Sequence, residues 1–450
     1  MSKLTVDILV IEIGSTITKV NAFGGFDQSE PCHLGQGSSL TTVDTDIMLG
    51  VNLAVEDLHQ RLGRQLTIGQ RLANSSAAGG LKMTVHGLTK DMTARAAKEA
   101  SLGAGAVVRY LTAGKITDRD LKQIEKTQPN LLLLSGGVDY GESDITLQNA
   151  EQLKKLNLPI PLLYAGNCIL ADEIRAIFSS TQFKLYIADN VFPAVDQFNI
   201  LPARHIIQKI FQEHIIHAKG MSRLQETIIS PIIPTPLAVL RITEALAESD
   251  MDDILVIDVG GATTDIHSVT EGEPANIRFL ASPEPRSKRT VEGDLGVYIN
   301  AENVKTIFDE SNPYDTNPYD LTLLKPMPSS ENEIYLSRSL TEKAVRIAVR
   351  RHAGRFATNI SLSDTNKTLS GKDLTAIKHI IGTGGALTRL EKGKEILEEV
   401  KSKNARKIAL PPPTAQTYID QRYIFSSCGT LIDYAPDIAC KLAKKSIGFY

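Results

Sequence analysis

The strongest constraint on this chain is the stretch ILVIDVGGATTDIHSV at residues 254–269. It begins with a short apolar, β-branched run that indicates a buried strand. A carboxylate ends the run, and two glycines follow where only a backbone without Cβ can turn tightly or approach a ligand closely. A second alternating run then closes the stretch. The residues between the two runs are Asp258, Gly260, Gly261, Thr263, Thr264 and Asp265.

This pattern predicts a hairpin whose turn presents backbone N–H groups and hydroxyls to a phosphate. The carboxylate would stand beside them and hold a metal-bound water. For this stretch taken alone, a tight hairpin with a capping Asp explains the residues equally well.

The same pattern occurs at residues 8–23, ILVIEIGSTITKVNAF. An apolar run again reaches a carboxylate, Glu12, and a glycine and hydroxyl turn follows. The turn and the start of the next strand contain Gly14, Ser15, Thr16, Thr18 and Lys19. The repeat favours two phosphate-type hairpins over two unrelated turns.

A third glycine stretch, IIGTGGAL, lies at residues 380–387. Its apolar run meets Gly382, Gly384 and Gly385 ahead of a predicted helix at residues 387–400. Two phosphate-type hairpins followed by a strand–GxGG–helix resemble the actin-like ATPases, which include actin, Hsp70 and the sugar kinases. In that superfamily the order is phosphate 1, phosphate 2, adenosine. The resemblance implies an α/β fold of two ribonuclease-H-like lobes, with mixed sheets flanked by helices, that binds ATP and Mg²⁺.

Composition narrows the function classes. Hydrophobic residues make up 42% of the 450 residues, which is ample for a buried core, and the net charge of −3 argues against a general nucleic-acid binder. No segment approaches the roughly 18 uninterrupted apolar residues of a membrane helix. The cysteines Cys32, Cys168, Cys428 and Cys440 have neither CxxC nor zinc-like spacing. Scattered thiols of this kind favour a cytoplasmic protein.

Residues 1–230 are predicted to form lobe I, completed by the C-terminal helix at 428–450. The Pro-punctuated stretch at 231–240 starts lobe II, residues 231–427. A polar surface excursion with a tandem NPYD is expected at 310–333.

Two basic stretches are further candidates. A third strand is expected at residues 276–281, and the run RSKRTVEGDLG at 286–296 then reads as a loop that either contacts phosphate or a partner, or is a solvated basic loop. A predicted helix at 341–357 carries Lys343, Arg346 and Arg350 on one face. Because Arg stacks on flat rings, Arg346 is a candidate nucleobase clamp, and a charged solvent face is the alternative.

Several stretches outside the nucleotide motifs narrow the resemblance: SSAAGGLKM, LSGGVDYGE, NVFPAVDQFNILPAR, RTVEGDLG and VRRHAG. With the two hairpins, they resemble the glutamate mutase accessory proteins of the MutL/GlmL type, over nearly the whole chain. The resemblance implies an actin-like ATPase that acts as a reactivating or assembly factor for an adenosylcobalamin-dependent mutase. Mutase subunits are therefore the expected partners.

The superfamily motifs map onto this chain with one departure. Glu12 stands where most members have Asp, whereas Asp258 keeps the acidic position of the second motif. Both carboxylates are expected to act through Mg²⁺ and its waters. The extra methylene of Glu12 moves its carboxylate by roughly an ångström, a misplacement that can cost about 10²-fold in rate. A slow ATPase that works as a switch is the expectation.

Two other functions fit the same scaffold. A small-molecule kinase would need a base such as Asp139 or Asp265. A nucleotide-gated scaffold without significant turnover would need no base, and Glu12 is compatible with it.

Overall fold

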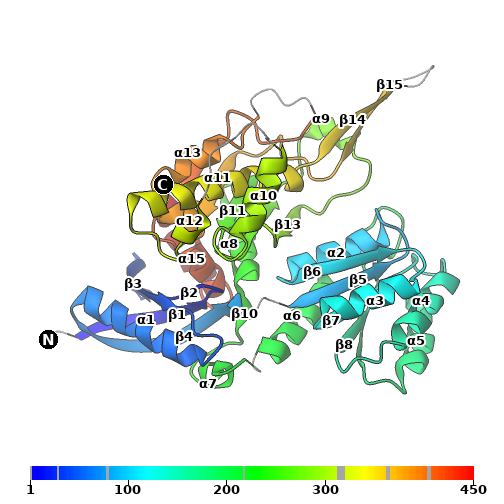
Figure 1. Cartoon of the computed structure of the whole chain (residues 1–450), viewed down its shortest axis with the longest axis horizontal. Helices are drawn as coiled ribbons and strands as arrows, with labels where there is room; N and C mark the ends of the chain where they lie inside the picture. The colour runs from blue at the N-terminus through cyan, green and yellow to red at the C-terminus, as the bar shows by residue number, and fades with distance from the viewer. Residues whose placement is uncertain are drawn as a thin grey trace. The chain divides into compact units, whose positions relative to one another are not determined.

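The computed structural model describes residues 3–27, 30–77, 81–215, 218–311, 320–360, 365–402 and 407–449 (Figure 1). Its contacts cluster into two compact units, Met1–Ala78 with Ile216–Tyr450, and Gly79–Ile215. The predicted division into lobes 1–230 and 231–427 stays a prediction, and part of the expected excursion at 310–333 lies outside the described residues.

The first unit contains a mixed five-stranded sheet built around the N-terminal repeat. The strands are β1 (Lys3–Ile13), β2 (Ile17–Gly24), β3 (Cys32–Leu40), β4 (Gln65–Ser75) and β10 (Ile233–Pro234). Their order is β10-β4-β1-β2-β3, with β1, β2 and β3 antiparallel and β4 and β10 parallel to β1. Helix α1 (Ile47–Leu62) packs closely on β3, since a Cβ on Gly37 would lie 2.0 Å from the Ala54 carbonyl oxygen.

A second mixed sheet in the same unit repeats this topology. Its strands are β11 (Ile254–Val259), β12 (Thr264–Val269), β13 (Ser287–Glu292), β16 (His379–Thr383) and β17 (Gln416–Ile419), in the order β13-β12-β11-β16-β17. Three strands are again antiparallel, and two run parallel to the first. The predicted fold class, the actin-like α/β fold with two mixed sheets flanked by helices, is confirmed.

The prediction of a third strand at 276–281 is wrong. Residues Pro274–Ile277 form the short helix α9, and β13 is built instead from the basic run, which was expected to be a loop. The run SKRTVE has one apolar residue and no alternation, so its sequence favoured a solvated loop over a strand.

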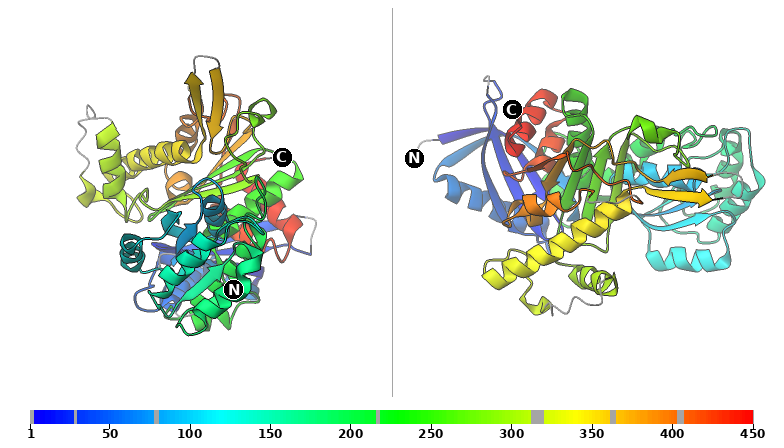
Figure 2. Two further views of the ribbon diagram at one scale, coloured as in Figure 1. Left: turned by 90° about the vertical axis from the view of Figure 1, so that its right-hand side faces the viewer. Right: turned by 90° about the horizontal axis from the view of Figure 1, so that it is seen from above.

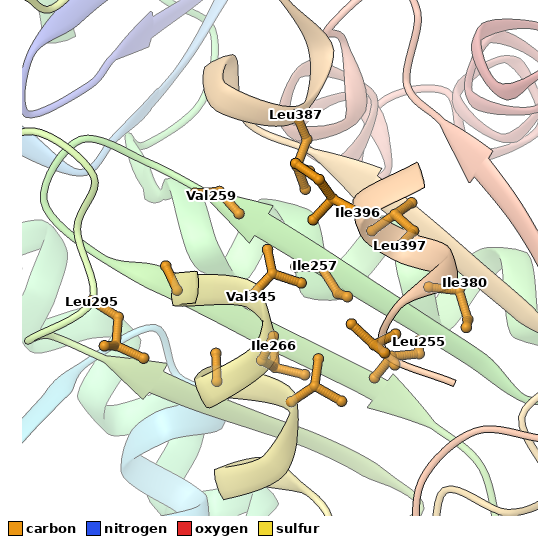
Figure 3. Packing of buried hydrophobic residues seen from close by; sticks show 14 of the residues in the cluster. Leu255, Ile257, Val259, Ile266, Leu295, Val345, Ile380, Leu387, Ile396 and Leu397 are labelled. Carbon is orange, nitrogen blue, oxygen red and sulfur yellow. The ribbon is translucent and has the colours of Figure 1, made fainter. Parts of the chain in front are cut away.

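Helices cover both faces of the second sheet. On one face, α11 (Glu331–His352) and α13 (Gly393–Glu398) pack on an apolar cluster that includes Leu255, Ile257 and Val345 (Figure 3). On the other, α8 (Thr235–Ser249), α14 (Phe425–Leu431) and α15 (Pro436–Ile447) enclose a second core.

Shorter elements complete this unit. They are α7 (Met221–Gln225), α10 (Ala301–Ser311), η3 (Leu321–Leu323), α12 (Gly385–Thr388) and the hairpin β14 (Arg355–Ile360) and β15 (Thr365–Ser370). The hairpin stands out from the second sheet (Figure 2). The single helix predicted at 387–400 is instead α12 and α13, separated at Lys392, whose φ of 67° is left-handed.

The second unit is a doubly wound α/β sandwich. Its strands β5 (Lys82–Gly87), β6 (Val107–Ala113), β7 (Leu131–Leu134), β8 (Pro161–Tyr164) and β9 (Lys184–Ile187) are all parallel, in the order β6-β5-β7-β8-β9. The connecting helices are α2 (Thr93–Gly103), α3 (Asp118–Thr127), α4 (Asp144–Lys154), η2 (Cys168–Leu170), α5 (Ala171–Phe178) and α6 (Leu201–Ile215). Numbered within the unit, the strand order is 2-1-3-4-5, that of flavodoxin-like folds. No helix in the described ranges has the length and apolarity needed to cross a membrane.

Candidate functional site: two facing turns

The two predicted phosphate hairpins have the same turn geometry and lie next to each other. Gly14 N donates to the Ile17 carbonyl at 3.0 Å, and Gly260 N donates to the Thr263 carbonyl at 2.9 Å. A Cβ atom on Gly261 would lie 2.6 Å from Thr16 Oγ1. The fold therefore brings turns that are far apart in sequence into contact, and a side chain at Gly261 would obstruct it.

The hydroxyls of these turns differ in what they can offer a ligand. Ser15 Oγ donates to the Ser76 carbonyl at 3.1 Å, and Thr263 Oγ1 donates to Asp265 at 2.9 Å. Thr264 is fully buried and its Oγ1 donates to the Leu295 carbonyl, so it serves the fold. Thr16 Oγ1 is buried and has no hydrogen-bond partner in the described part of the chain. Its unsatisfied hydroxyl fits a missing phosphate oxygen.

Asp258 is the uncommitted carboxylate of the site. It is half-buried at the end of β11, and no described residue donates a hydrogen bond to it. Burial, reinforced by Asp265 and Glu12, raises the pKa of Asp258 to about 7. The third glycine stretch lies directly against it, because a Cβ on Gly384, where φ is 87°, would meet Asp258 Oδ1 at 2.6 Å.

Glu12, in contrast, is already paired. Its Oε2 lies 3.1 Å from Lys19 Nζ and also accepts a hydrogen bond from Ser426 Oγ. Lys19 Nζ in turn lies 3.0 Å from the centroid of the Tyr423 ring and donates to the Tyr423 carbonyl at 3.2 Å. Burial lowers the pKa of Lys19, although Glu12 and other carboxylates oppose the shift. The first carboxylate is thus less available than the second.

Asp265 forms a buried ion pair with Arg289. The guanidinium Nε and one terminal nitrogen lie 3.1 and 2.7 Å from Asp265 Oδ1. Only 1% of the Arg289 side chain is exposed. The solvated-loop alternative for the basic run is therefore wrong at this position.

Two residues that the sequence did not single out complete the cluster. Asp420, fully buried after β17, accepts hydrogen bonds from Thr383 Oγ1 and from the N–H groups of Ile424 and Phe425. A carboxylate directly after the short β-branched and aromatic run TYI was the available signal. Tyr423, with a left-handed φ of 52°, had no such signal because its contact with Lys19 spans the whole chain.

The cluster has an excess of negative charge. Glu12 pairs with Lys19 and Asp265 pairs with Arg289, whereas Asp258 and Asp420 form no ion pair within the described part of the chain. Among the described residues there is no group of three or more His, Cys, Asp and Glu side chains placed to bind a metal directly. One carboxylate without a cation partner, Asp258, is the kind of group that contacts Mg²⁺ through its waters.

The remaining predicted residues lie in different settings. A Cβ on Gly382 would touch Ile419, Leu397 and Leu387, which makes this glycine a packing position. Gly385 has open space beside the Tyr423 ring. On α11 Arg346 is exposed whereas Lys343 is buried, so the two do not share a solvent face. A contact between Arg346 and a nucleobase stays a prediction.

The duplicated mixed sheets and the facing turns define an actin-like ATPase fold. Within that class the chain belongs to the MutL protein family, whose model matches residues 8–447. It is 35% identical over 458 residues to Protein MutL of Clostridium tetanomorphum, covering 97% of this chain and 98% of that relative.

Solved structures with similar folds include two reactivating factors. A glycerol dehydratase reactivase has a TM-score of 0.35 at 10% identity, over 95% of this chain and 99% of that one. The nucleotide-free diol dehydratase-reactivating factor has a TM-score of 0.34 at 12% identity, over 95% and 99%. The MamK double helical filament has a TM-score of 0.29 at 10% identity, over 95% and 98%. The assignment to the actin-like fold and to the MutL family rests on the sheet topology and on the family match.

Proposed function

We propose that this chain is an ATP-binding accessory factor that reactivates or assembles an adenosylcobalamin-dependent mutase such as glutamate mutase. Membership of the MutL family supports the choice of mutase. The observation that carries the nucleotide-binding part is the pair of facing turns, with Thr16 Oγ1 buried and unpartnered against Gly261. An orphaned hydroxyl between two glycine turns is an expected feature of a phosphate site.

Different residues of the site suit the phosphates, the nucleoside and the Mg²⁺ ion of Mg·ATP. The Thr16 hydroxyl and the turn N–H groups other than those of Gly14 and Gly260 suit phosphate oxygens. Lys19 would reach these oxygens on leaving Glu12. Gly385 leaves room for the nucleoside, whereas Gly384 lies against Asp258. Asp258 suits a water of Mg²⁺. When bound, Mg²⁺ would neutralise charge on the phosphates. Because a cation favours the ionised carboxylate, it would bring the raised pKa of Asp258 back down.

Slow turnover follows from the state of Glu12. Its carboxylate is held by Lys19 and Ser426, and release from both would be needed before it could position a metal-bound water. The protein would therefore stay in its nucleotide-bound form for long periods, as a switch requires.

Coupling to a partner would pass through the helices that follow the two sheets. Helix α8 follows β10 and α14 follows β17, and a Cβ on Gly429 of α14 would lie 1.7 Å from the Ala238 carbonyl of α8. The two turns belong to different sheets, so any change in their separation must be accommodated at this backbone contact. Only a differential affinity of nucleotide for the two arrangements can drive such a change.

The test is ATP hydrolysis with Mg²⁺, with and without glutamate mutase inactivated by damaged cobalamin. We expect slow basal turnover that the mutase stimulates, and recovery of mutase activity only with ATP and free adenosylcobalamin. Asp258→Ala should abolish both. The matched control Asp252→Ala changes an exposed carboxylate two residues before β11 and should behave as wild type.

The alternatives predict different products. Stoichiometric phosphorylation of a metabolite would identify a kinase, although Asp265, one candidate base, is already held by Arg289. ATP binding without turnover or recovery under any condition would leave a nucleotide-gated scaffold and reject the reactivating role.

A further inference from the structure

The unit formed by residues 79–215 has its exposed apolar side chains at one edge. In its described part, 81–215, the large hydrophobic residues that are exposed are Tyr140, Ile169, Val195 and Leu201. All four follow the carboxyl ends of β7, β8 or β9, and Tyr140 is 80% exposed. Exposed apolar side chains gathered in this way are typical of an interaction surface.

The loops that carry these side chains are tied together by one residue. Asp139 N donates to the Pro193 carbonyl at 2.9 Å, and Asp139 Oδ1 accepts from Cys168 N and Asn190 Nδ2, both at 2.9 Å. Asp139 therefore links the loops after β7, β8 and β9. These hydrogen bonds fix the positions of the loops that carry the exposed apolar side chains. They favour a structural role for Asp139 over its candidate role as a catalytic base.

The backbone at this edge stores strain beside the apolar tips. Tyr140 has a φ of 61° and Asp196 a φ of 60°, a left-handed region that side chains other than Gly, Asn and Asp rarely occupy. The Tyr140 side chain is mostly exposed, so packing in a hydrophobic core does not explain this backbone conformation. Strained, exposed residues of this kind cluster at binding sites.

The place where doubly wound sheets bind small molecules is filled in this unit. That place is the switch point between β5 and β7. The N–H groups of Leu88 and Thr89 both donate to Thr93 Oγ1, at 2.8 and 3.1 Å. A Cβ on Gly166 would lie 2.7 Å from Gly136 N, so the next two loops are in backbone contact. The N–H groups of Leu88 and Thr89, which could otherwise bind a phosphate, already donate to Thr93. This favours a protein over a nucleotide as the ligand of this edge.

The three loops that carry the apolar tips are mostly acidic in their own residues, and the guanidinium of Arg95 in α2 lies 5.8 Å from the centroid of the Phe198 ring in the third of them. Loops 135–145, 165–175 and 187–200 carry one cation, Arg175, which pairs with Asp172 at 2.7 Å. They carry seven carboxylates: Asp139, Glu142, Asp144, Asp172, Glu173, Asp189 and Asp196. Apolar tips inside an acidic rim are complementary to an apolar patch with a basic rim.

A cavity of about 420 Å³ lies at the same edge. The residues that line it include the apolar Ile187, Pro202 and Ile206 and the carboxylate Asp189. Apolar walls with one carboxylate suit the long stem and charged end of Lys or Arg.

We propose that the carboxyl edge of this unit docks a basic, apolar-centred face of a folded protein, which inserts a Lys or Arg beside Asp189. The proposal rests on the proposed function, because it takes the mutase as that protein. The doubly wound unit would thus recognise the partner, while the facing turns of the other unit would bind nucleotide.

The test is titration calorimetry of the full chain with glutamate mutase assembled from its subunits. Tyr140→Gly removes the ring and suits the left-handed backbone, so it should keep or raise the melting temperature while weakening binding about tenfold or more. Asp189→Lys should weaken binding by at least as much. The matched charge reversal Glu125→Lys, on an exposed position of α3, should leave binding within about twofold of wild type.

Each outcome decides between the two proposals. Weaker binding by Tyr140→Gly and Asp189→Lys, but not by Glu125→Lys, supports the docking edge. Wild-type binding that both variants retain overturns it and leaves the proposed function standing. A wild-type chain that does not bind the mutase at all rejects both. Equal weakening by Glu125→Lys would show a general charge effect and would also overturn the docking edge.

Discussion

At the scale of single residues, the two hairpins are equivalent in register but opposite in charge. Glu12 pairs across the hairpin with Lys19, and Asp258 pairs across the hairpin with Asp265. The first carboxylate thus faces a cation on its neighbouring strand. The second faces another carboxylate, whose cation, Arg289, comes from β13. Burial is the main cause of the raised pKa of Asp258, and the facing Asp265 adds to it. Asp258 is left without a cation on its neighbouring strand, whereas Glu12 is held by Lys19.

Asp258→Asn should change how stability depends on pH. The pKa of Asp258 rises from an ordinary 3.8 to about 7 in the folded chain. The folded protein therefore holds this proton over that range while the unfolded chain loses it, and the free energy of unfolding falls as pH rises from about 4 to 7. Asn cannot ionise. The variant should be more stable than wild type at pH 8, by about 2–4 kcal/mol.

Urea unfolding at pH 5, 6, 7 and 8 measures this difference. The gap between variant and wild type should be small at pH 5 and widen up to pH 7, and saturating Mg²⁺ with ATP should narrow it. Parallel pH profiles for the two proteins would show that Asp258 ionises normally.

Residues of the site were predictable where a local pattern carries them. The strand–carboxylate–glycine pattern was enough to find Glu12, Asp258 and the turns. It could not show that Thr264 is buried or that Gly382 is a packing position, because both follow from neighbours on other elements. Tyr423 and Asp420 reach the cluster only through the pairing of β16 with β17, which no local pattern encodes.

At the scale of elements, the duplication extends beyond the hairpins. After the hairpin, each sheet continues with a third antiparallel strand and then with two strands parallel to its first strand, and a helix follows the last of them. In each sheet a side-chain hydrogen bond joins the fourth strand along the chain to a residue that follows the fifth. Thr235 Oγ1, at the start of α8, donates to Asn74 of β4, and Thr383 Oγ1 of β16 donates to Asp420 after β17. The helices that follow, α8 and α14, meet at Gly429.

Gly429→Ala should force these helices apart. The added Cβ would overlap the backbone of Ala238, which cannot move aside as a flexible side chain could. Overpacking of this kind costs about 1–3 kcal/mol, and thermal unfolding of the full chain measures it. Gly385→Ala is the matched control, because the nearest atom to its Cβ lies 3.9 Å away. Equal melting temperatures for Gly429→Ala and wild type would contradict the close contact.

Elements were predicted well where apolar periodicity is clean and poorly where polarity misleads. The apolar runs that open the two hairpins were predicted to be strands, and they lie in β1 and β11 with residues 8–11 and 254–257 buried. The basic run that forms β13 was missed because its cations find buried carboxylates, as Arg289 does with Asp265. The helix predicted at 387–400 is divided at Lys392, which has a left-handed φ. Lysine rarely adopts this conformation, so the sequence does not predict the break.

At the scale of the whole molecule, the chain combines an actin-like ATPase unit with a doubly wound unit made from residues 79–215. The resemblance to actin-like proteins came from three glycine motifs, all of which lie in the first unit. The second unit carries no such motif. Its organisation is set by which parallel strands pair, so its separate identity emerged only from the structure.

Calorimetric binding of Mg·ATP to wild type and to Thr16→Val tests the nucleotide site. The hydroxyl of Thr16 has no partner among the described residues, so its replacement by a methyl group should leave the melting temperature unchanged or higher. If the two facing turns hold the phosphates, the variant should bind Mg·ATP about 10- to 100-fold more weakly, the worth of a hydrogen bond to a charged group. Unchanged affinity in Thr16→Val, or a wild-type chain that does not bind Mg·ATP, would contradict the site.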